Sequence, residues 1–266
     1  MAFLSFRDTR LFHGSRANLI YEFLGRRFSK ADHWRFMNYG YAFDDPSRDL
    51  ALQPEDEDER YGAQLYHLVA SQADLAGKRL LDVGSGRGGG ASYVHRYLGP
   101  RQTIGMDFAQ SAVTHCRRIY SDVAGLEFTV GDAMDTPFDS CSFDAVMNVE
   151  SAHCYPVREA FLAEVLRVLK PGGSFLFTDF TTRRDHSLPD IDAAGFEVLG
   201  EHDVTPGILK ALTVDKVRRR REVDRHVPFG LRWLGNLWAG GPGSWIYNDF
   251  QDGSRRYVLY HARKPQ

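Results

Sequence analysis

A glycine-rich turn is the first feature of the sequence that could hold a ligand. The apolar run Leu80–Val83 leads directly into Gly84-Ser85-Gly86-Arg87-Gly88-Gly89-Gly90. Glycines at 84 and 86 remove the side chains that would keep a ligand away from the backbone, and a turn from strand to helix aims its N–H groups outward. Gly84, Gly86 and Gly89 also fit the GxGxxG spacing that binds dinucleotides or nucleosides. Taken alone, the turn is open to a purely structural role as well.

Two aspartates follow the next two predicted strands. Asp107 ends the run Thr103–Asp107, where a carboxylate can accept hydrogen bonds from both hydroxyls of a ribose. Asp132 comes directly after Leu126–Val130, beside Ala133, and an acid there can receive an adenine amino group. The ribose contact suits NAD and S-adenosylmethionine (SAM) alike.

An imidazole and a carboxylate follow the fourth and fifth predicted strands. His153 lies in the run Asn148–Pro156, and it can deprotonate a hydroxyl near neutral pH. Asp179 ends the neighbouring strand, and parallel strands place their carboxyl ends side by side. We therefore predict His153 as a general base and Asp179 as the partner that orients and charge-stabilises it.

Other interpretations of these residues stay open. His153 is also explained as a hydrogen-bonded histidine at a strand end, and Asp179 as a cap on a turn. Glu150, which we include among the catalytic residues, either contacts the cofactor through neighbouring backbone or forms a salt bridge. Cys154 fits a small buried residue better than a nucleophile, because no acyl-transfer motif accompanies it.

Strands that alternate with helices must position these residues. The predicted strands cover Arg79–Val83, Thr103–Asp107, Leu126–Val130, Phe143–Val149 and Ser174–Phe180. Helical spacing of apolar residues predicts helices over Ala91–Leu98, Ala109–Tyr120 and Arg158–Leu169. This alternation predicts an α/β fold with a parallel sheet covered on both sides.

The order of these features resembles that of the class I SAM-dependent methyltransferases. The glycine turn, Asp107, Val130–Ala133 and the link Leu169–Phe175 carry the resemblance, which covers about residues 60–204. It implies a Rossmann-like seven-stranded sheet, flanked by helices, whose last strand runs antiparallel. It also favours SAM over NAD.

The resemblance implies a cofactor site, residue by residue. The methionine part of SAM would lie against Gly84, Ser85 and Gly86, and the ribose against Asp107. Phe108 would cover one adenine face, and Asp132 with Ala133 its edge. Tyr39 and Asn148 complete the predicted set.

The stretches that contain the predicted catalytic residues resemble two groups of methyltransferases more closely. Glu150–His153 with Thr178–Phe180 resembles sugar O-methyltransferases of the rebeccamycin type, whose catalytic His and Asp occupy matching places. A closer resemblance is to the phthiotriolone and phenolphthiotriolone dimycocerosate O-methyltransferases, which modify long lipid-like polyketides. The matching stretches are Gly88–Tyr93, Asn148–Pro156, Phe161–Val165 and Val223–His226, whereas Asp82-Val83-Gly84 departs from the pattern. The Asn/Asp-Pro-Pro-Tyr/Phe motif of many amino-group methyltransferases is absent, which argues against a nucleic-acid base or protein glutamine as acceptor.

The flanking segments predict a covered binding site. We expect residues 1–60 to form an aromatic lid segment, although its run Trp34–Tyr41 also fits an amphipathic helix packed on the body. Residues 61–204 form the SAM-binding core, which ends with a strand at Phe196–His202, and residues 205–245 an inserted substrate cap. The aromatic and apolar residues expected to line a hydrophobic pocket are Trp34, Phe36, Tyr39, Tyr41, Phe229, Trp233, Leu237 and Trp238.

The last segment, residues 246–266, is expected to complete the sheet. Its β-like runs Trp245–Phe250 and Arg255–His261 surround the turn signal Asp252-Gly253, which predicts a hairpin.

Composition excludes several other classes. The 266 residues carry 33 Lys+Arg and 35 Asp+Glu, a net charge of −2, which argues against a nucleic-acid partner. The arginines at 218–221 lie among Asp215, Glu222 and Asp224, which predicts a solvated cap helix. The acidic run Glu55–Glu59 predicts a solvated helix start rather than a metal site. No apolar run approaches the ~18 residues of a membrane span. Three cysteines without a CxxC pattern fit a reducing cytoplasm, and the oligomeric state, a homodimer included, stays open.

The sequence thus predicts a SAM-dependent methyltransferase that acts on a hydroxyl of a hydrophobic small molecule, such as a polyketide, a lipid or a glycosylated natural product. The alternatives are C-methylation of a sterol-like or quinone-like acceptor, an NAD-dependent oxidoreductase, and a cyclase-like protein that binds SAM without methyl transfer.

Overall fold

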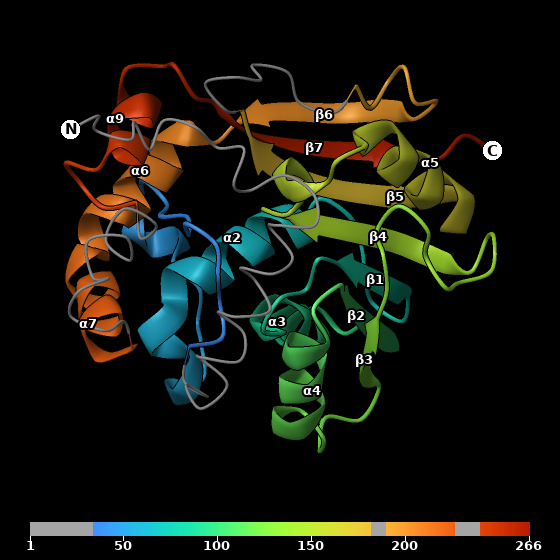
Figure 1. Cartoon of the computed structure of the whole chain (residues 1–266), viewed down its shortest axis with the longest axis horizontal. Coiled ribbons are helices and arrows are strands. Elements are labelled where there is room, and N and C mark those ends of the chain that lie inside the picture. Colours follow the sequence, from blue (N-terminus) through green and yellow to red (C-terminus); the bar gives the residue numbers. More distant parts are fainter. Residues whose placement is uncertain (1–33, 182–189, 227–239) are drawn as a thin grey trace, which may run out of the picture.

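The computed structural model describes residues 34–181, 190–226 and 240–266. At its centre lies a seven-stranded sheet with the strand order β3-β2-β1-β4-β5-β7-β6 (Figure 1). Strand β7 runs antiparallel to both of its neighbours, β5 and β6, and the other pairs are parallel. The strands are β1 (Arg79–Val83), β2 (Gln102–Asp107), β3 (Leu126–Val130), β4 (Phe143–Val149), β5 (Leu169–Phe180), β6 (Glu197–Asp203) and β7 (Tyr257–Arg263). The predicted methyltransferase-like sheet is confirmed.

Helices cover both faces of the sheet. They are α2 (Arg60–Ala70), α3 (Gly89–Leu98), α4 (Gln110–Ile119), α5 (Arg158–Val168), α6 (Thr205–Val214), α7 (Lys216–His226) and α9 (Trp245–Gln251). Short 3₁₀ helices form at η2 (Pro46–Arg48), η3 (Pro54–Glu59) and η4 (Ala152–Cys154). In the described part of the chain, no helix is both long and apolar enough to cross a membrane.

Alternate strand residues enter two separate apolar clusters. Leu80 of β1 packs with Leu65 of α2 on one face, and Leu81 packs with Phe161 of α5 on the other. Each such side chain, fully buried, contributes about 1.5–3 kcal/mol to folding. Helices α6 and α9 join the cluster of α2, so the segment between β6 and β7 packs against the same face.

The site forms where the strand order reverses. Strand β2 lies on one side of β1, and β4 lies on the other. At such a reversal of strand order, a crevice forms outside the carboxyl ends of the parallel strands. Asp107, Glu150 and the glycine turn after Val83 all lie at this edge.

The predicted strand Trp245–Phe250 is wrong, because this stretch is helix α9. Trp, Ile, Tyr and Phe have high β propensity, but packing overrides propensity. Ile246 and Phe250, four residues apart, both bury against the core, and the Oγ of Ser244 accepts a hydrogen bond from the N–H of Tyr247 at 3.1 Å. The predicted hairpin therefore does not form, and β7 alone completes the sheet, between β5 and β6.

Two predicted segments lie partly outside the described residues. The run Trp34–Tyr41 is described, and it forms no helix. Residues 205–226 form α6 and α7, and 240–245 are described as well. Residues 1–33 and 227–239 lie outside, and with them Phe229, Trp233, Leu237 and Trp238.

Candidate active site

A cavity of about 400 Å³ opens at the carboxyl ends of β1, β2 and β4. Its walls come from distant parts of the sequence: the extended segment Arg35–Tyr39, the glycine turn, the loop Glu150–Pro156 after β4, and Arg219 of α7. The sheet therefore supplies the floor, and segments outside the core supply part of the wall.

The glycine turn is built for close approach. Gly84 and Gly86 have φ of +75° and +53°, a backbone region that favours glycine. A Cβ on Gly84 would lie 2.3 Å from the Oγ of Ser151. The N–H groups of Gly84 and Ser85 donate to the carbonyl of Met106 at 2.8 and 3.0 Å, which joins the turn to β2.

The acids after β2 and β3 line the same cavity. Asp107 accepts hydrogen bonds from the N–H groups of Gly86 at 2.8 Å and Ala109 at 2.9 Å, so its carboxylate is fixed beside the turn. The ring of Phe108 is 52% exposed at the cavity, and Asp132 and Ala133 line it. A glycine cradle, a fixed carboxylate and an exposed aromatic face together fit an adenosine with a flexible charged extension.

Asn148 lies behind the cavity wall. Its side chain is buried, and its Nδ2 donates to the carbonyl of Val83 at 2.9 Å and to the Oγ of Ser151 at 2.7 Å. The structure thus places Asn148 as a tie between β1 and the loop after β4, in contact with the wall rather than with the cavity itself.

The predicted imidazole–carboxylate pair forms. His153 Nδ1 lies 2.9 Å from Asp179 Oδ1, and the His153 backbone N–H donates to Asp179 Oδ2 at 2.8 Å. His153 lines the cavity, with its ring 4.5 Å from that of Phe180, while Asp179 is buried behind it. Burial disfavours the imidazolium, but Cys154 and Asp179 outweigh it and raise the pKa of His153 well above its ordinary value.

Glu150 occupies a strained position at the end of β4. Its φ is +51°, which a non-glycine residue adopts at a cost of about 1–3 kcal/mol. Its Oε1 accepts hydrogen bonds from the N–H of Tyr39 at 2.7 Å and the hydroxyl of Tyr257 at 2.6 Å. Burial raises the pKa of Glu150 to about 7. Glu150 thus ties the N-terminal segment to the sheet while it faces the cavity.

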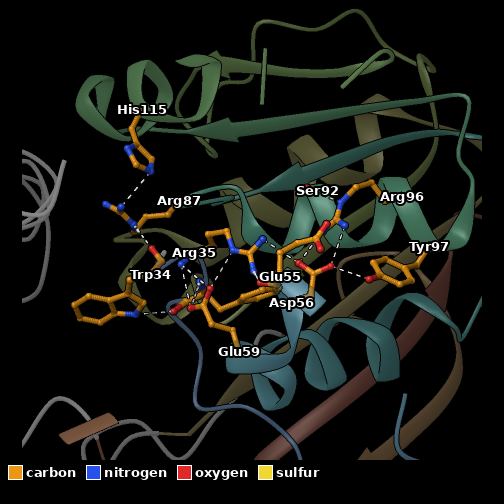
Figure 2. Close-up of polar contacts among 11 residues, drawn as sticks. Trp34, Arg35, Glu55, Asp56, Glu59, Arg87, Ser92, Arg96, Tyr97 and His115 are labelled. Carbon is orange, nitrogen blue, oxygen red and sulfur yellow. Dashed lines mark hydrogen bonds and ion pairs between the residues drawn. The ribbon is translucent and has the colours of Figure 1, made fainter. Parts of the chain in front are cut away.

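The acidic run after Pro54 is solvated only in part: Glu55, Glu57 and Asp58 are exposed, as the charge of the run predicts, but Asp56 and Glu59 are buried. Asp56 is 1% exposed and Glu59 3%. Glu59 accepts hydrogen bonds from the backbone N–H groups of Arg35 at 3.0 Å and Phe36 at 3.1 Å (Figure 2). The hydrophobic periodicity of the sequence cannot predict these hydrogen bonds, because the donors lie in an irregular segment more than twenty residues away.

Asp56 extends this network toward α3. It forms ion pairs at 2.9 Å with Arg35 and with Arg96, and the hydroxyl of Tyr97 donates to it at 2.7 Å (Figure 2). On the other side, the Nε of Arg87 in the glycine turn donates to the carbonyl of Trp34. Residues 34 and 35, at the start of the cavity wall, are therefore tied through Asp56 to α3 and through Arg87 to the glycine turn.

Arg219 is a wall residue that the sequence marked only as one of four consecutive arginines. It belongs to the run of arginines at 218–221, of which only Arg219 lines the cavity. Within the described ranges, no group of three His, Cys, Asp or Glu side chains is placed to hold a metal.

Comparison with known proteins agrees with this geometry. Residues 81–177 match the methyltransferase domain family. The chain is 40% identical over 252 residues to the fatty-acid O-methyltransferase of Mycolicibacterium smegmatis, covering 93% of this chain and 89% of that protein. It is 38% identical over 227 residues to the phthiotriol/phenolphthiotriol dimycocerosates methyltransferase of Mycobacterium tuberculosis, covering 85% and 83%.

A solved structure shares the fold. The geranyl diphosphate C-methyltransferase of Streptomyces coelicolor superposes with a TM-score of 0.68 at 19% identity, over 94% of this chain and all of that one. The predicted resemblance to the dimycocerosate methyltransferases and the choice of SAM over NAD are both confirmed. From its sheet, its glycine cradle and its relatives, the chain belongs to the class I SAM-dependent methyltransferases.

Proposed function

We propose that this methyltransferase transfers the methyl group of SAM to a hydroxyl of a lipid-like molecule, with His153 as the general base. The observation that carries the proposal is the His153–Asp179 pair, at 2.9 Å, whose imidazole lines the same cavity as the glycine turn. The names of the relatives support a lipid-like acceptor, since they specify fatty acids and phthiotriol dimycocerosates.

In this proposal the cofactor is held along the carboxyl edge of β1 and β2. Gly84, Ser85 and Gly86 border its methionine part, Asp107 accepts hydrogen bonds from the ribose, and Phe108 stacks on the adenine. Asp132 and Ala133 border the adenine edge, and Tyr39 closes the opposite side. When bound, SAM supplies an electrophilic sulfonium methyl group, which leaves sulfur for the acceptor oxygen.

His153 takes the proton of the acceptor hydroxyl. The carboxylate of Asp179 can only accept hydrogen bonds, so the neutral imidazole carries its proton on Nδ1 and keeps Nε2 as the basic nitrogen. Asp179 then stabilises the imidazolium that forms. Phe36, Tyr39 and Phe180 supply apolar and aromatic surface to the cavity, which suits an acyl or polyketide chain.

Replacing the base tests this function. We expect His153→Ala to lower the rate of hydroxyl methylation about 100-fold or more, because it removes the proton acceptor. The measurement is formation of S-adenosylhomocysteine (SAH) and the gain of one CH₂ in acceptor mass, with a long-chain alcohol as acceptor. His202→Ala, at an exposed histidine of β6, is the matched control. SAH should bind His153→Ala as it binds the wild type, and an unchanged turnover would exclude His153 as the base.

C-methylation is the second candidate, and the strained, buried Glu150 favours it. A carboxylate beside the cavity can stabilise the positive charge that develops when carbon is methylated. Glu150→Gln would then reduce turnover more than His153→Ala on the same acceptor. The reverse order supports O-methylation.

A further inference from the structure

Tyr66 brings a hydroxyl group to the cavity from a helix of the core. It belongs to α2, its side chain is 6% exposed, and it lines the cavity. The ring packs in the apolar cluster that contains Leu65, and it meets the ring of Phe36 edge to face, with 5.9 Å between the centroids. The apolar part of Tyr66 is therefore held by the core, while its polar end reaches the ligand cavity.

The end of the glycine run makes room for this ring. Gly90 is the second residue of α3, and a Cβ there would lie 1.9 Å from Cζ of Tyr66, the carbon that carries the hydroxyl. A side chain at position 90 and the phenol ring cannot both occupy that space. The hydroxyl end of Tyr66 therefore lies beside the glycine turn, whose residues Gly84, Ser85 and Gly86 line the same cavity.

The Tyr66 hydroxyl has no hydrogen-bond partner among residues 34–181, 190–226 and 240–266. Two other tyrosines near the cavity differ in this respect: the hydroxyl of Tyr155 lies 2.9 Å from the Oγ of Ser151, and that of Tyr257 donates to Glu150. A hydroxyl that is removed from bulk water without a partner costs free energy. A ligand in the cavity that hydrogen-bonds Tyr66 would remove this cost.

The charges that act most strongly on Tyr66 indicate which ligand group fits. Burial raises the pKa of Tyr66 well above its ordinary value, and the carboxyl groups of Asp82, Glu150 and Asp107 raise it further. The hydroxyl therefore keeps its proton. These carboxyl groups would stabilise a cation beside Tyr66 and repel an anion. The hydroxyl oxygen can accept a hydrogen bond, and an ammonium group is a cation that donates one.

We propose that the hydroxyl of Tyr66 binds the ammonium group of the methionine part of SAM. The inference rests on the proposed function for the position of the cofactor, because that proposal places the methionine part against the glycine turn. Tyr66 would then be a binding residue that comes from a core helix, apart from the turn itself and from His153. The glycine at position 90 would serve the same contact, because it lets the phenol approach the turn.

Two ligands that differ only in the amino group test this contact. Tyr66→Phe removes the hydroxyl and keeps the ring that packs against Gly90. We expect Tyr66→Phe to weaken SAH binding about 10- to 100-fold in isothermal titration, because a hydrogen bond to a charged group is lost. Des-amino SAH, in which hydrogen replaces the amino group, should bind the variant as it binds the wild type. Tyr61→Phe removes a hydroxyl from the same helix, outside the cavity, and should bind SAH normally.

Thermal unfolding separates this role from a structural one. Without ligand, Tyr66→Phe should have the Tm of the wild type or a higher one, because the hydroxyl loses no partner within the protein. A lower Tm would count against the proposal. An unchanged SAH affinity in Tyr66→Phe, or an equal loss for SAH and des-amino SAH, would overturn it. These titrations need no acceptor, so a failure of hydroxyl methylation would overturn the proposed function alone.

Discussion

At the scale of single residues, the His153–Asp179 pair decides how the site responds to pH. Asp179 accepts hydrogen bonds from the backbone N–H groups of His153 and Phe180 as well as facing the imidazole. The carboxylate is therefore held in one orientation, and the imidazole with it. Burial opposes the charged imidazole, but Cys154 and Asp179 together raise the pKa of His153 well above its ordinary value. The neutral base is the minor form below that pKa.

The raised pKa of His153 determines in which direction kcat changes with pH. A base must be neutral to take a proton, so we expect kcat to rise with pH through the pKa of His153. Asp179→Asn removes the charge that stabilises the imidazolium, so the midpoint of the rise should move to lower pH. The plateau should also fall, on the order of 100-fold, because the base is weaker and less well oriented.

The pH profile of kcat at saturating SAM, measured on wild type and Asp179→Asn, checks this prediction. Asp192→Asn, at an exposed aspartate, is the control. A midpoint that stays in place would show that Asp179 does not act through His153.

At the scale of elements, an irregular segment rather than a helix or strand forms part of the cavity wall. Residues 34–39 belong to no helix or strand, so side chains accept the hydrogen bonds of their backbone N–H groups. Glu59 accepts the N–H groups of Arg35 and Phe36, and Glu150 accepts that of Tyr39. Because buried N–H groups must be paired, these carboxylates fix the path of the cavity wall.

Glu59→Gln tests this role of the network. The amide keeps one acceptor oxygen but loses the ion pair with Arg35, whose Nε lies 3.2 Å from Glu59. We expect a loss of about 1–3 kcal/mol in the free energy of unfolding and weaker SAH binding, since the wall segment is released. Urea unfolding and isothermal titration measure the two effects.

Glu57 offers a matched control in the same run. Its side chain is 43% exposed and pairs with Arg60, three residues further along the chain. Glu57→Gln should therefore change the unfolding free energy by less than about 1 kcal/mol and leave SAH affinity unchanged. Equal effects of the two variants would mean that the burial of Glu59 has no bearing on the cavity.

At the scale of the whole molecule, features formed by neighbouring residues can be predicted from the sequence, whereas contacts between distant segments cannot. The five core strands and the residues at their ends follow from runs of a few residues, and so the glycine turn, Asp107 and His153 could be found. Arg219 and Glu59 could not, because each acts through contacts with a segment far away in the chain. Helix α9 was missed for a related reason: the apolar face that Ile246 and Phe250 cover exists only once α6 and the sheet are in place.

The cavity joins these distant parts, so a bound ligand should stabilise the entire fold. A ligand that contacts the glycine turn, residues 35–39 and α7 binds only the folded chain. At a concentration 100 times its Kd, SAH should add about 2.7 kcal/mol to the free energy of unfolding. For a chain of this size, that corresponds to a rise in Tm of roughly 5–10 °C.

Asp107→Ala should abolish most of this rise, because Asp107 is the proposed ribose acceptor. The variant also loses the hydrogen bond from the Gly86 N–H, so its Tm without ligand will fall, and the quantity to compare is the shift on adding SAH. Asp122→Ala, at an exposed aspartate after α4, should keep the full shift. Differential scanning calorimetry at matched SAH concentrations gives both values. A full shift in Asp107→Ala would place the nucleoside elsewhere in the cavity, away from the end of β2.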